Sequence, residues 1–317
     1  MENEPSIITV GLSPSWDITC LGRNIEWGKH QIIDEQTILP AGKAFNISRA
    51  LAWMGQKSIA AGLWGNSDFE RMQLISRELW PLIDTKLTAV EGQTRTNVTI
   101  VDTAAKKEIH LRSRRHLVSK EALSKLESNV LKIVKKGSIC VFSGAVPEND
   151  YLDDVIGIIE KCYNAGAKIV LDTSGHALRR IIETGLVWIV KPNVEELRDV
   201  LSETIEDNPD SLITAGRTFL DRVENILISR GDEGAILINK SGALQCNASQ
   251  ERDVFSTVGC GDYLLAGFLK GWNDTEQEDS ALTTAVKVAT AKAWGWMQVK
   301  SWPEVMEQVQ VKLSRLK

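Results

Sequence analysis

The sequence predicts an α/β fold with a mostly parallel central sheet, helices on both of its faces, and a small β-sheet that acts as a lid. Short runs rich in β-branched residues alternate with amphipathic helical patterns, which is typical of βαβ units. Two segments, about 17–39 and 94–113, interrupt this alternation and supply the lid. No internal repeat or Pro/Ser-rich linker divides the sequence, so we expect a single domain over residues 1–317.

The first third of the chain mixes the two kinds of pattern. A strand is expected at residues 7–12, and an irregular stretch follows at residues 17–39. The apolar residues of the segment 41–55 recur with helical spacing and end at a glycine, so a helix is expected there. Residues 94–102 and 108–113 alternate like the two strands of an exposed hairpin.

The remaining two thirds alternate strands and helices more clearly. A Gly turn separates two strands within residues 224–239. Further strands are expected at residues 138–144, 168–175 and 186–193. Helices are expected at residues 151–166, 194–203, 262–272, 280–296 and 303–316.

The composition is that of an ordinary globular protein, with 43% hydrophobic and 25% charged residues among 317. A net charge of -5 argues against nucleic acid or an anionic membrane surface as the partner. No apolar run approaches the roughly 18 residues of a membrane span, and the N-terminus carries acids where a signal peptide carries basic residues. The five cysteines form no C-x-x-C pair and resemble reduced thiols. A cytoplasmic protein is therefore expected.

Polar residues and glycines follow several of the expected strands. In an open parallel sheet, ligands bind beyond the carboxyl ends of the strands, so these positions are where a site is expected. They are Ser143-Gly144, Asp172-Thr173-Ser174-Gly175, Lys191-Pro192-Asn193 and Ser229-Arg230-Gly231.

The segment STVGCGDYLLAGF places an acid directly after a G-x-G turn, at the start of an expected helix. The amides of Gly259, Cys260 and Gly261 could hold an anion, because glycines allow close approach and the helix dipole favours negative charge there. Asp262 could then take a proton from a substrate hydroxyl that attacks a phosphoryl group. The alternative is that Asp262 simply caps the helix.

The segment AGKAFN precedes a second helix and combines a glycine, a cation and an amide. Lys43 and Asn46 suit a polar, phosphorylated ligand at the start of this helix. A lysine is unfavourable near a helix N-terminus, which raises the odds of an anionic partner. The alternative is a solvated lysine.

Several motifs together resemble those of the ribokinase-like PfkB carbohydrate kinases. They occur in the family's order from residue 13 to about residue 270, so the resemblance covers most of the chain. The motifs are SPSWD, AGKAFN, TRTNVTI, SGAVP, DTSGHAL, KPNVEEL, ISRGDEGAI and GCGD. The resemblance implies a ribokinase-like fold and a Mg²⁺-dependent enzyme that uses ATP.

The resemblance also implies a role for individual residues. Asp262 corresponds to the catalytic base, and Gly259, Cys260 and Gly261 to the anion hole. Residues expected to hold the substrate are Asp17, Lys29, Gly42, Lys43, Asn46, Arg95, Asn97 and Ser143. Those expected to bind ATP are Lys191, Asn193, Ser229, Gly231 and Gly234. Asn193, Glu196 and, through water, Asp172 are expected near the magnesium, whereas Glu195 is expected only to stabilise its own helix.

Two cations limit the candidate substrates to phosphorylated sugars. Lys43 and the T-R-x-N segment resemble the branch of the family that acts on phosphosugars, such as 1-phosphofructokinase and tagatose-6-phosphate kinase. Lys43 and Arg95 would meet the substrate phosphate, with Lys29 reaching in from the lid. The expected substrate is therefore a ketohexose phosphate: fructose 1-phosphate, tagatose 6-phosphate or fructose 6-phosphate. The alternative for Arg95 is an exposed hairpin cation.

The chain departs from the family pattern in places that shape the sugar pocket. Ala41 and Ala44 stand where the family has glycines, GCGD replaces G-A-G-D, and SPSWD replaces N-P-A-L-D. Trp16 is the tryptophan expected to touch the substrate, because it precedes Asp17. The alternatives are a kinase for an unphosphorylated sugar or nucleoside, and a non-catalytic sugar-phosphate sensor. The family also suggests a homodimer joined through the β-lids.

Overall fold

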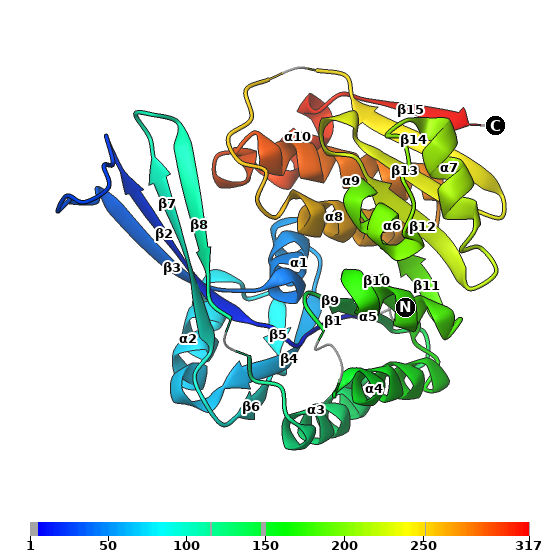
Figure 1. Ribbon diagram of the computed structural model, residues 1–317, viewed down its shortest axis with the longest axis horizontal. Helices are drawn as coiled ribbons and strands as arrows, with labels where there is room; N and C mark the ends of the chain where they lie inside the picture. Colours follow the sequence, from blue (N-terminus) through cyan, green and yellow to red (C-terminus); the bar gives the residue numbers. More distant parts are fainter. Residues whose placement is uncertain (1–5, 115, 147–149, 251, 317) are drawn as a thin grey trace.

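The computed structural model describes residues 6–114, 116–146, 150–250 and 252–316. Its body is built on one large sheet with the strand order β15-β14-β13-β12-β11-β10-β9-β1-β4-β5, in which β6 also pairs with β4 (Figure 1). The pairs from β5 to β12 are parallel, and β12 to β15 are antiparallel. The strands are β1 (Ile7–Gly11), β4 (Ser58–Gly65), β5 (Ile83–Thr85), β6 (Thr88–Val90), β9 (Ile139–Ser143), β10 (Lys168–Asp172), β11 (Val187–Val190), β12 (Val223–Ser229), β13 (Ala235–Asn239), β14 (Gly242–Ala248) and β15 (Val311–Leu316). The predicted α/β class with a mostly parallel sheet is confirmed.

Helices cover both faces of this sheet, and each face has its own hydrophobic core. One core packs α1 (Lys43–Trp53), α8 (Cys260–Thr275) and α9 (Glu278–Ala293) against the sheet. The other core packs α3 (Lys120–Ile133), α4 (Leu152–Asn164), α5 (Gly175–Glu183), α6 (Val194–Leu201) and α7 (Pro209–Arg217) against the opposite face. The remaining helices are α2 (Phe69–Leu79) and α10 (Trp302–Gln308). Among the described helices, none is long and apolar enough to cross a bilayer.

A separate small sheet forms the predicted lid and projects from the body as a long arm (Figure 1). Its strand order is β3-β2-β7-β8, from β2 (Ser15–Gly22), β3 (Glu35–Ala41), β7 (Arg95–Asp102) and β8 (Lys107–Arg112). The predicted hairpin of the second segment is confirmed, since β7 and β8 pair antiparallel. The stretch expected to be irregular at residues 17–39 is irregular only at residues 23–34, because its two ends pair as β2 and β3.

The C-terminal segment also differs from the prediction. The helix expected at residues 303–316 ends at Gln308, and the last residues form β15 instead. This strand pairs antiparallel with β14 along its whole length. Its sequence VKLSRL is rich in good helix formers, so pairing with the edge of the main sheet overrides the local preference and decides its conformation.

Two glycines bring α8 and α9 close together. A Cβ atom on Gly267 would lie 2.8 Å from Ala285 Cα, and one on Gly271 would lie 2.8 Å from Ala281 Cα. Real side chains cannot approach a backbone so closely, so only glycine fits at these two positions. The close packing aligns the C-terminal end of α9 with the N-terminal end of α8, where the G-x-G turn lies.

A glycine in β4 makes a testable prediction about stability. Gly62 has φ +123°, and a Cβ atom there would lie 2.1 Å from Gly11 O on β1. Gly62→Ala should therefore lower the free energy of unfolding by about 3 kcal/mol or more in urea titrations. The control is Gly137→Ala, which also has a positive φ but meets nothing within 4 Å, and it should cost only roughly 1–2 kcal/mol. Equal losses in the two variants would contradict the steric argument.

Candidate active site

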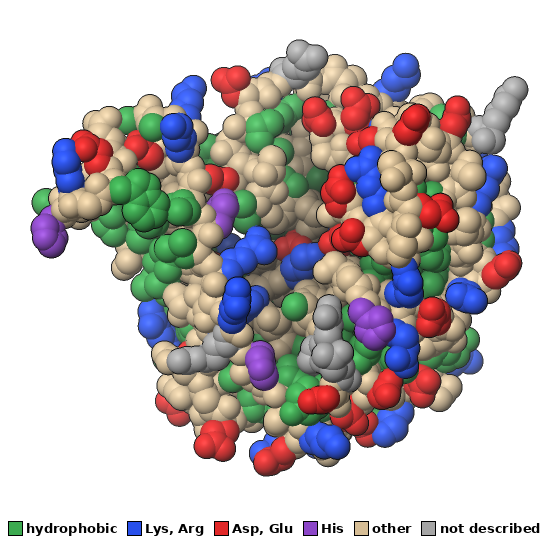
Figure 2. Space-filling view, viewed as in Figure 1, with side chains coloured by type: hydrophobic (Ala, Val, Ile, Leu, Met, Phe, Trp, Pro, Cys, Tyr) green, Lys and Arg blue, Asp and Glu red, His purple; other side chains and the backbone are tan. Residues whose placement is uncertain are grey.

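The surface is hollowed between the lid and the body (Figure 2). Figure 2 shows basic side chains along this hollow, with acidic side chains deeper inside. Ser143, Asp172, Lys191 and Ser229 follow or end the neighbouring strands β9, β10, β11 and β12, so their positions converge at one edge of the sheet. Parallel strand order thus brings together residues that are far apart in the sequence.

Asp172 is the centre of a buried cluster. Its side chain is 0% exposed, and Ser143 Oγ donates to its Oδ2 at 3.0 Å. Lys191 Nζ and Lys43 Nζ lie 3.2 and 3.3 Å from its Oδ1. Burial alone would raise the pKa of Asp172, but the two lysines outweigh it and hold the pKa below its ordinary value. Asp172 is therefore a fixed negative charge that draws two cations together.

Asp262 lies in the first turn of α8, and its side chain is buried. The N-cap of this helix is Gly259, so the alternative that Asp262 is the capping residue is wrong. Asn46 Nδ2, from α1, donates to Asp262 Oδ2 at 2.9 Å. Burial, reinforced by the negative charge of Asp172, raises the pKa of Asp262 to about 7, although Asn46, Lys43 and Lys191 oppose the shift. A carboxylate with such a pKa is suited to accept a proton near neutral pH.

The G-x-G turn presents backbone amides beside this carboxylate. Gly259 has φ +78°, a conformation that favours glycine. The amide of Cys260 already donates to Thr257 O at 3.2 Å. No acceptor among the described residues takes the amides of Gly259 and Gly261, so these two point their donors outward at the helix N-terminus. Such an arrangement favours an anion.

Two lysines flank this turn, and the sequence reading missed one of them. A Cβ atom on Gly261 would lie 3.5 Å from Lys191 Nζ, and one on Gly259 would lie 3.9 Å from Lys292 Cε. Lys292 is near the end of α9, and burial lowers its pKa while Cys260 and Asp262 oppose that shift. No local motif surrounds it, because only the close packing of α8 on α9 brings it to the turn.

The pKa of Lys43 shifts in the opposite direction from that of Lys292. Burial lowers its pKa, but Asp172, Asp262 and Glu196 outweigh burial and raise it. Its side chain is 41% exposed, so the ammonium group is charged and reachable from the hollow. Gly42, just before it, has φ +113°, and a Cβ atom there would press on Pro14 Cα at 3.1 Å. The glycine of this motif is thus required by the backbone.

At the root of the lid, Asp17 and Asn97 lie opposite each other on β2 and β7. Asn97 Nδ2 donates to Asp17 Oδ1 at 3.0 Å, and Ser15 Oγ donates to the same oxygen at 2.8 Å. The other polar atom of Asn97, Oδ1, is buried without a hydrogen-bond partner among the described residues. An unpaired buried acceptor is costly, so Asn97 is ready to accept a hydrogen bond from a ligand.

Arg95 is not the exposed hairpin cation of the alternative reading. Its guanidinium is partly buried and donates to the backbone carbonyls of Pro14 at 3.2 Å, Ser13 at 3.2 Å and Ser113 at 3.4 Å. A guanidinium has five N–H donors, so these bonds leave capacity for a ligand. Burial lowers the pKa of Arg95, with Arg112 adding to the shift and Asp17 opposing it.

Two other lid residues, Lys29 and Trp16, do not take the positions expected of them. Lys29 is not brought to the site: it lies between β2 and β3, is 62% exposed and pairs with Glu26 at 2.5 Å. The expectation that Trp16 touches the substrate is wrong. Trp16 is only 5% exposed, and its indole donates to Asp68 Oδ2 at 2.9 Å. Neighbouring residues of a strand point to opposite faces, so Trp16 turns away from the side that Asp17 faces.

On the nucleotide side, Asn193 and Glu196 form a capping box at the start of α6. Glu196 N donates to Asn193 Oδ1 at 2.7 Å, and Asn193 N donates to Glu196 Oε2 at 2.9 Å. The N-x-x-E spacing therefore has a structural role in addition to any role near a metal. The structural expectation for Glu195 is confirmed, since its carboxylate pairs with Arg198 of its own helix at 2.5 Å.

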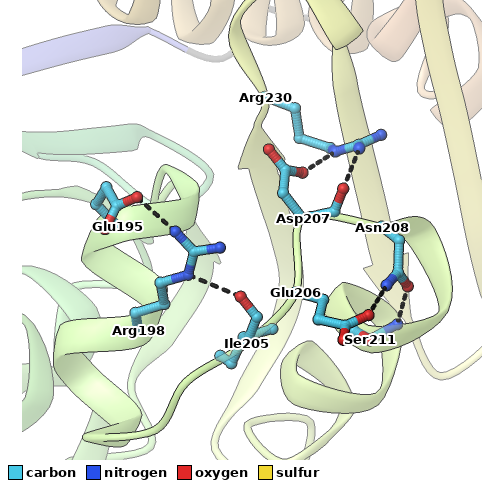
Figure 3. Close-up of polar contacts among 8 residues, drawn as sticks. All are labelled: Glu195, Arg198, Ile205, Glu206, Asp207, Asn208, Ser211 and Arg230. Carbon is cyan, nitrogen blue, oxygen red and sulfur yellow. Dashed lines mark hydrogen bonds and ion pairs between the residues drawn. The ribbon is translucent and has the colours of Figure 1, made fainter.

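The buried side chain of Arg230 holds the turn after β12, a role that the sequence did not predict. Arg230 Nε donates to Asp207 Oδ1 at 2.8 Å, and its Nη2 donates to Asp207 O at 3.2 Å (Figure 3). This contact ties the turn with Gly231 and Gly234 to the segment before α7. Gly234 also meets a steric need, because a Cβ atom there would lie 2.1 Å from Cys246 O.

The described residues contain no cluster of three or more His, Cys, Asp or Glu side chains that could hold a metal by themselves. Both oxygens of Asp172 already accept from protein groups, so its predicted role near a metal depends on water. Glu196 is partly exposed. This donor set fits Mg²⁺, which binds through few carboxylates and completes its shell with water and phosphate.

The SGAVP motif is only partly described, because Pro147 lies outside the described residues. Its first residue, Ser143, contacts Asp172 as given above. The arrangement thus gathers a buried carboxylate, open amides and several cations at one edge of the sheet.

Comparisons with known proteins agree with this geometry. Residues 16–293 match the family model of pfkB family carbohydrate kinases. A 1-phosphofructokinase from Haemophilus influenzae is 26% identical over 313 residues, covering 96% of this chain and 98% of the relative. A 1-phosphofructokinase from Borreliella burgdorferi is 28% identical over 290 residues, covering 90% and 91%.

The fold has close neighbours among solved structures. The crystal structure of phosphofructokinase-2 from Escherichia coli in complex with fructose-6-phosphate has a TM-score of 0.86 at 20% identity, covering 96% of this chain and 97% of that chain. At this identity the likeness shows the ribokinase-like fold alone. Together with the family match over most of the sequence, it means that this chain belongs to the pfkB family of carbohydrate kinases and is a phosphotransferase.

Proposed function

We propose that this protein transfers the γ-phosphoryl group of ATP to a free hydroxyl of a ketohexose phosphate. The candidate substrates are fructose 1-phosphate, tagatose 6-phosphate and fructose 6-phosphate. The observation that carries the proposal is the buried Asp262 carboxylate, with a pKa of about 7, beside the open amides of the G-x-G turn. The names of the two curated relatives and the fructose-6-phosphate complex of the fold neighbour support this substrate class.

The reaction requires a base, an anion site and charge neutralisation, and the chain offers each. Asp262 takes the proton of the attacking hydroxyl as its oxygen bonds to the γ-phosphorus and the bond to the ADP oxygen breaks. The amides of Gly259 and Gly261 hold the migrating phosphoryl group, with Lys191 near Gly261 and Lys292 near Gly259. Phosphoryl transfer depends on such positioning and electrostatic stabilisation more than on covalent chemistry.

The sugar end of the substrate meets the lid root and α1. Asp17, Asn46 and Asn97 supply acceptors and amide groups for sugar hydroxyls. Lys43 supplies a reachable positive charge for the substrate phosphate, and the spare donors of Arg95 add to it. These cations compensate locally for the net negative charge of the protein.

A Mg²⁺ ion fits the nucleotide side of this site. Glu196 and Asn193 would hold it through water at the start of α6, and a bound Mg²⁺ supplies charge neutralisation on the ATP phosphates. The same two residues also form the capping box of this helix.

Asp262→Asn should lower kcat by between about a hundredfold and ten-thousandfold, because the amide cannot accept the hydroxyl proton. ADP release with each ketohexose phosphate and ATP measures this loss. The variant should still bind ATP, since the open amides and lysines remain. Asp274→Asn, at the far end of the same helix, is the matched control and should keep wild-type activity.

The pH dependence tests the same residue in the wild-type enzyme. The base acts only when ionised, so kcat/KM should fall as the pH drops through about 7 and level off above it. The residual rate of Asp262→Asn should lack this step, and removal of Mg²⁺ by a chelator should abolish ADP release. An unchanged rate in Asp262→Asn would remove the proposed base, and phosphosugar binding without any ADP release would favour the sensor.

Lys43→Met should raise KM for the phosphorylated sugar by about tenfold or more, because a charge-assisted contact to the phosphate is lost. The KM for the matching unphosphorylated sugar should not change. Loss of Lys43 also raises the pKa of Asp262, so the assay should run well above that pKa. Lys57→Met, an exposed lysine just after α1, is the control. A preference of the wild type for neutral sugars would contradict the role of Lys43.

The lid also supports the proposal of a homodimer. Trp27 and Ile32, in the connection between β2 and β3, are 88% and 94% exposed, and large exposed apolar side chains favour association. Sedimentation of the wild type should give the mass of two chains, and replacing both residues by Ser should give one. Val299→Ser, an exposed apolar residue elsewhere, is the control. A wild-type monomer at assay concentration would overturn the dimer.

A further inference from the structure

The carboxylate of Asp68 accepts hydrogen bonds from three side chains. Trp16 Nε1 donates to its Oδ2 at 2.9 Å, and Trp64 Nε1 donates to its Oδ1 at 2.8 Å. Thr94 Oγ1 also donates to Oδ1, at 3.0 Å. The donors Trp16, Trp64 and Thr94 are 5%, 0% and 1% exposed. One side chain therefore satisfies three buried donors, none of which plays a part in the chemistry described above.

The three donors come from both sides of the junction between lid and body. Trp64 belongs to β4 of the central sheet, whereas Trp16 belongs to β2 of the lid and Thr94 directly precedes β7. Trp16 is followed by Asp17, and Thr94 by Arg95. The carboxylate thus fixes the residues next to two proposed substrate groups.

Apolar packing reinforces the same junction. Trp16 and Trp64 meet edge to face with their ring centroids 5.5 Å apart, and both pack with Met72 of α2. Ile38 of β3 packs against this cluster, so both early lid strands contribute. The guanidinium of Arg71 lies 4.9 Å from the centroid of the Trp16 ring. The lid is therefore anchored at its root, while its far end projects into solvent (Figure 1).

The three donors require a side chain with two acceptor oxygens. Two indoles and a hydroxyl converge on two oxygens, and a carboxylate offers about four acceptor sites and no donor. An asparagine would turn an N–H₂ group toward one of these donors and leave it unpaired. Because a buried unpaired donor is costly, the chain on that side would shift.

We propose that Asp68 is a positioning residue that fixes the lid root so that Asp17 and Arg95 meet the sugar phosphate in the right geometry. This inference rests on the proposed function, because it concerns the same substrate. We expect Asp68 to affect only the groups that bind the sugar phosphate. The groups around ATP, on α8, α9 and the strand ends, are not bonded to Asp68.

The competing explanation is that Asp68 only supports the start of α2, where it is the N-cap residue. Its side chain makes no capping hydrogen bond, but its negative charge lies near the helix N-terminus. Glu70 carries the same charge in the first turn of the same helix and is exposed. Glu70→Gln is therefore a matched control that removes one charge and leaves the indoles in place.

The test compares Asp68→Asn, Glu70→Gln and the wild type. Asp68→Asn should raise KM for the ketohexose phosphate by about tenfold and change KM for ATP by less than about twofold, since small misplacements of binding groups are costly. Glu70→Gln should change neither constant. Equal changes in both KM values for Asp68→Asn, or no change in either, would overturn the proposal.

A second readout does not depend on the substrate. Amide hydrogen exchange should be faster in residues 15–22 and 95–102 of Asp68→Asn, and unchanged in Glu70→Gln. If the wild type phosphorylates no ketohexose phosphate, the proposed function fails and this readout alone decides whether Asp68 holds the lid root. Exchange that is unchanged in the lid, or faster only in α2, would refute it.

A milder variant covers the case in which Asp68→Asn does not fold. Trp16→Phe keeps an aromatic ring on the lid side and removes the indole N–H together with part of the packing of the larger ring. It should raise KM for the sugar phosphate in the same direction and speed exchange in residues 15–22. Wild-type values for both would again overturn the role of Asp68.

Discussion

Asp172 lies fully buried at the end of β10, and its carboxylate stays charged there because Lys43 and Lys191 are held against it. An unpaired carboxylate at this depth would be costly, and removing either lysine would leave the charge poorly compensated. The pairing has a second effect, because the negative charge of Asp172 helps to raise the pKa of Asp262. One ion cluster thus places two cations and adjusts the proposed base.

The pairing of buried acids with lysines also explains how a protein of net negative charge can bind phosphate groups. Its net charge is -5, yet lysines from α1, from the end of β11 and from α9 surround the turn before α8. Each is partly or fully withdrawn from water, where a positive charge acts more strongly than it does at an exposed surface. Close packing through Gly267 and Gly271 brings the α9 lysine into this group.

The lid divides into two parts with different properties. Its root is tied to the body by Asp68, by paired indoles and by the carbonyl contacts of Arg95. Its far end carries exposed apolar residues and has no such anchor among the described contacts. A lid built in this way can close at its end while its substrate groups keep their places.

The sequence by itself determined the α/β class, the lid segments and the G-x-G-D turn, because these depend on local periodicity and on residues close together in the chain. It did not determine that β15 replaces the last turns of the expected helix, that Trp16 turns inward to Asp68, or that Lys292 reaches Gly259. Each of these depends on contacts between segments far apart in the sequence. Only tertiary packing decides such contacts, since local patterns carry no information about which distant partner a side chain will meet.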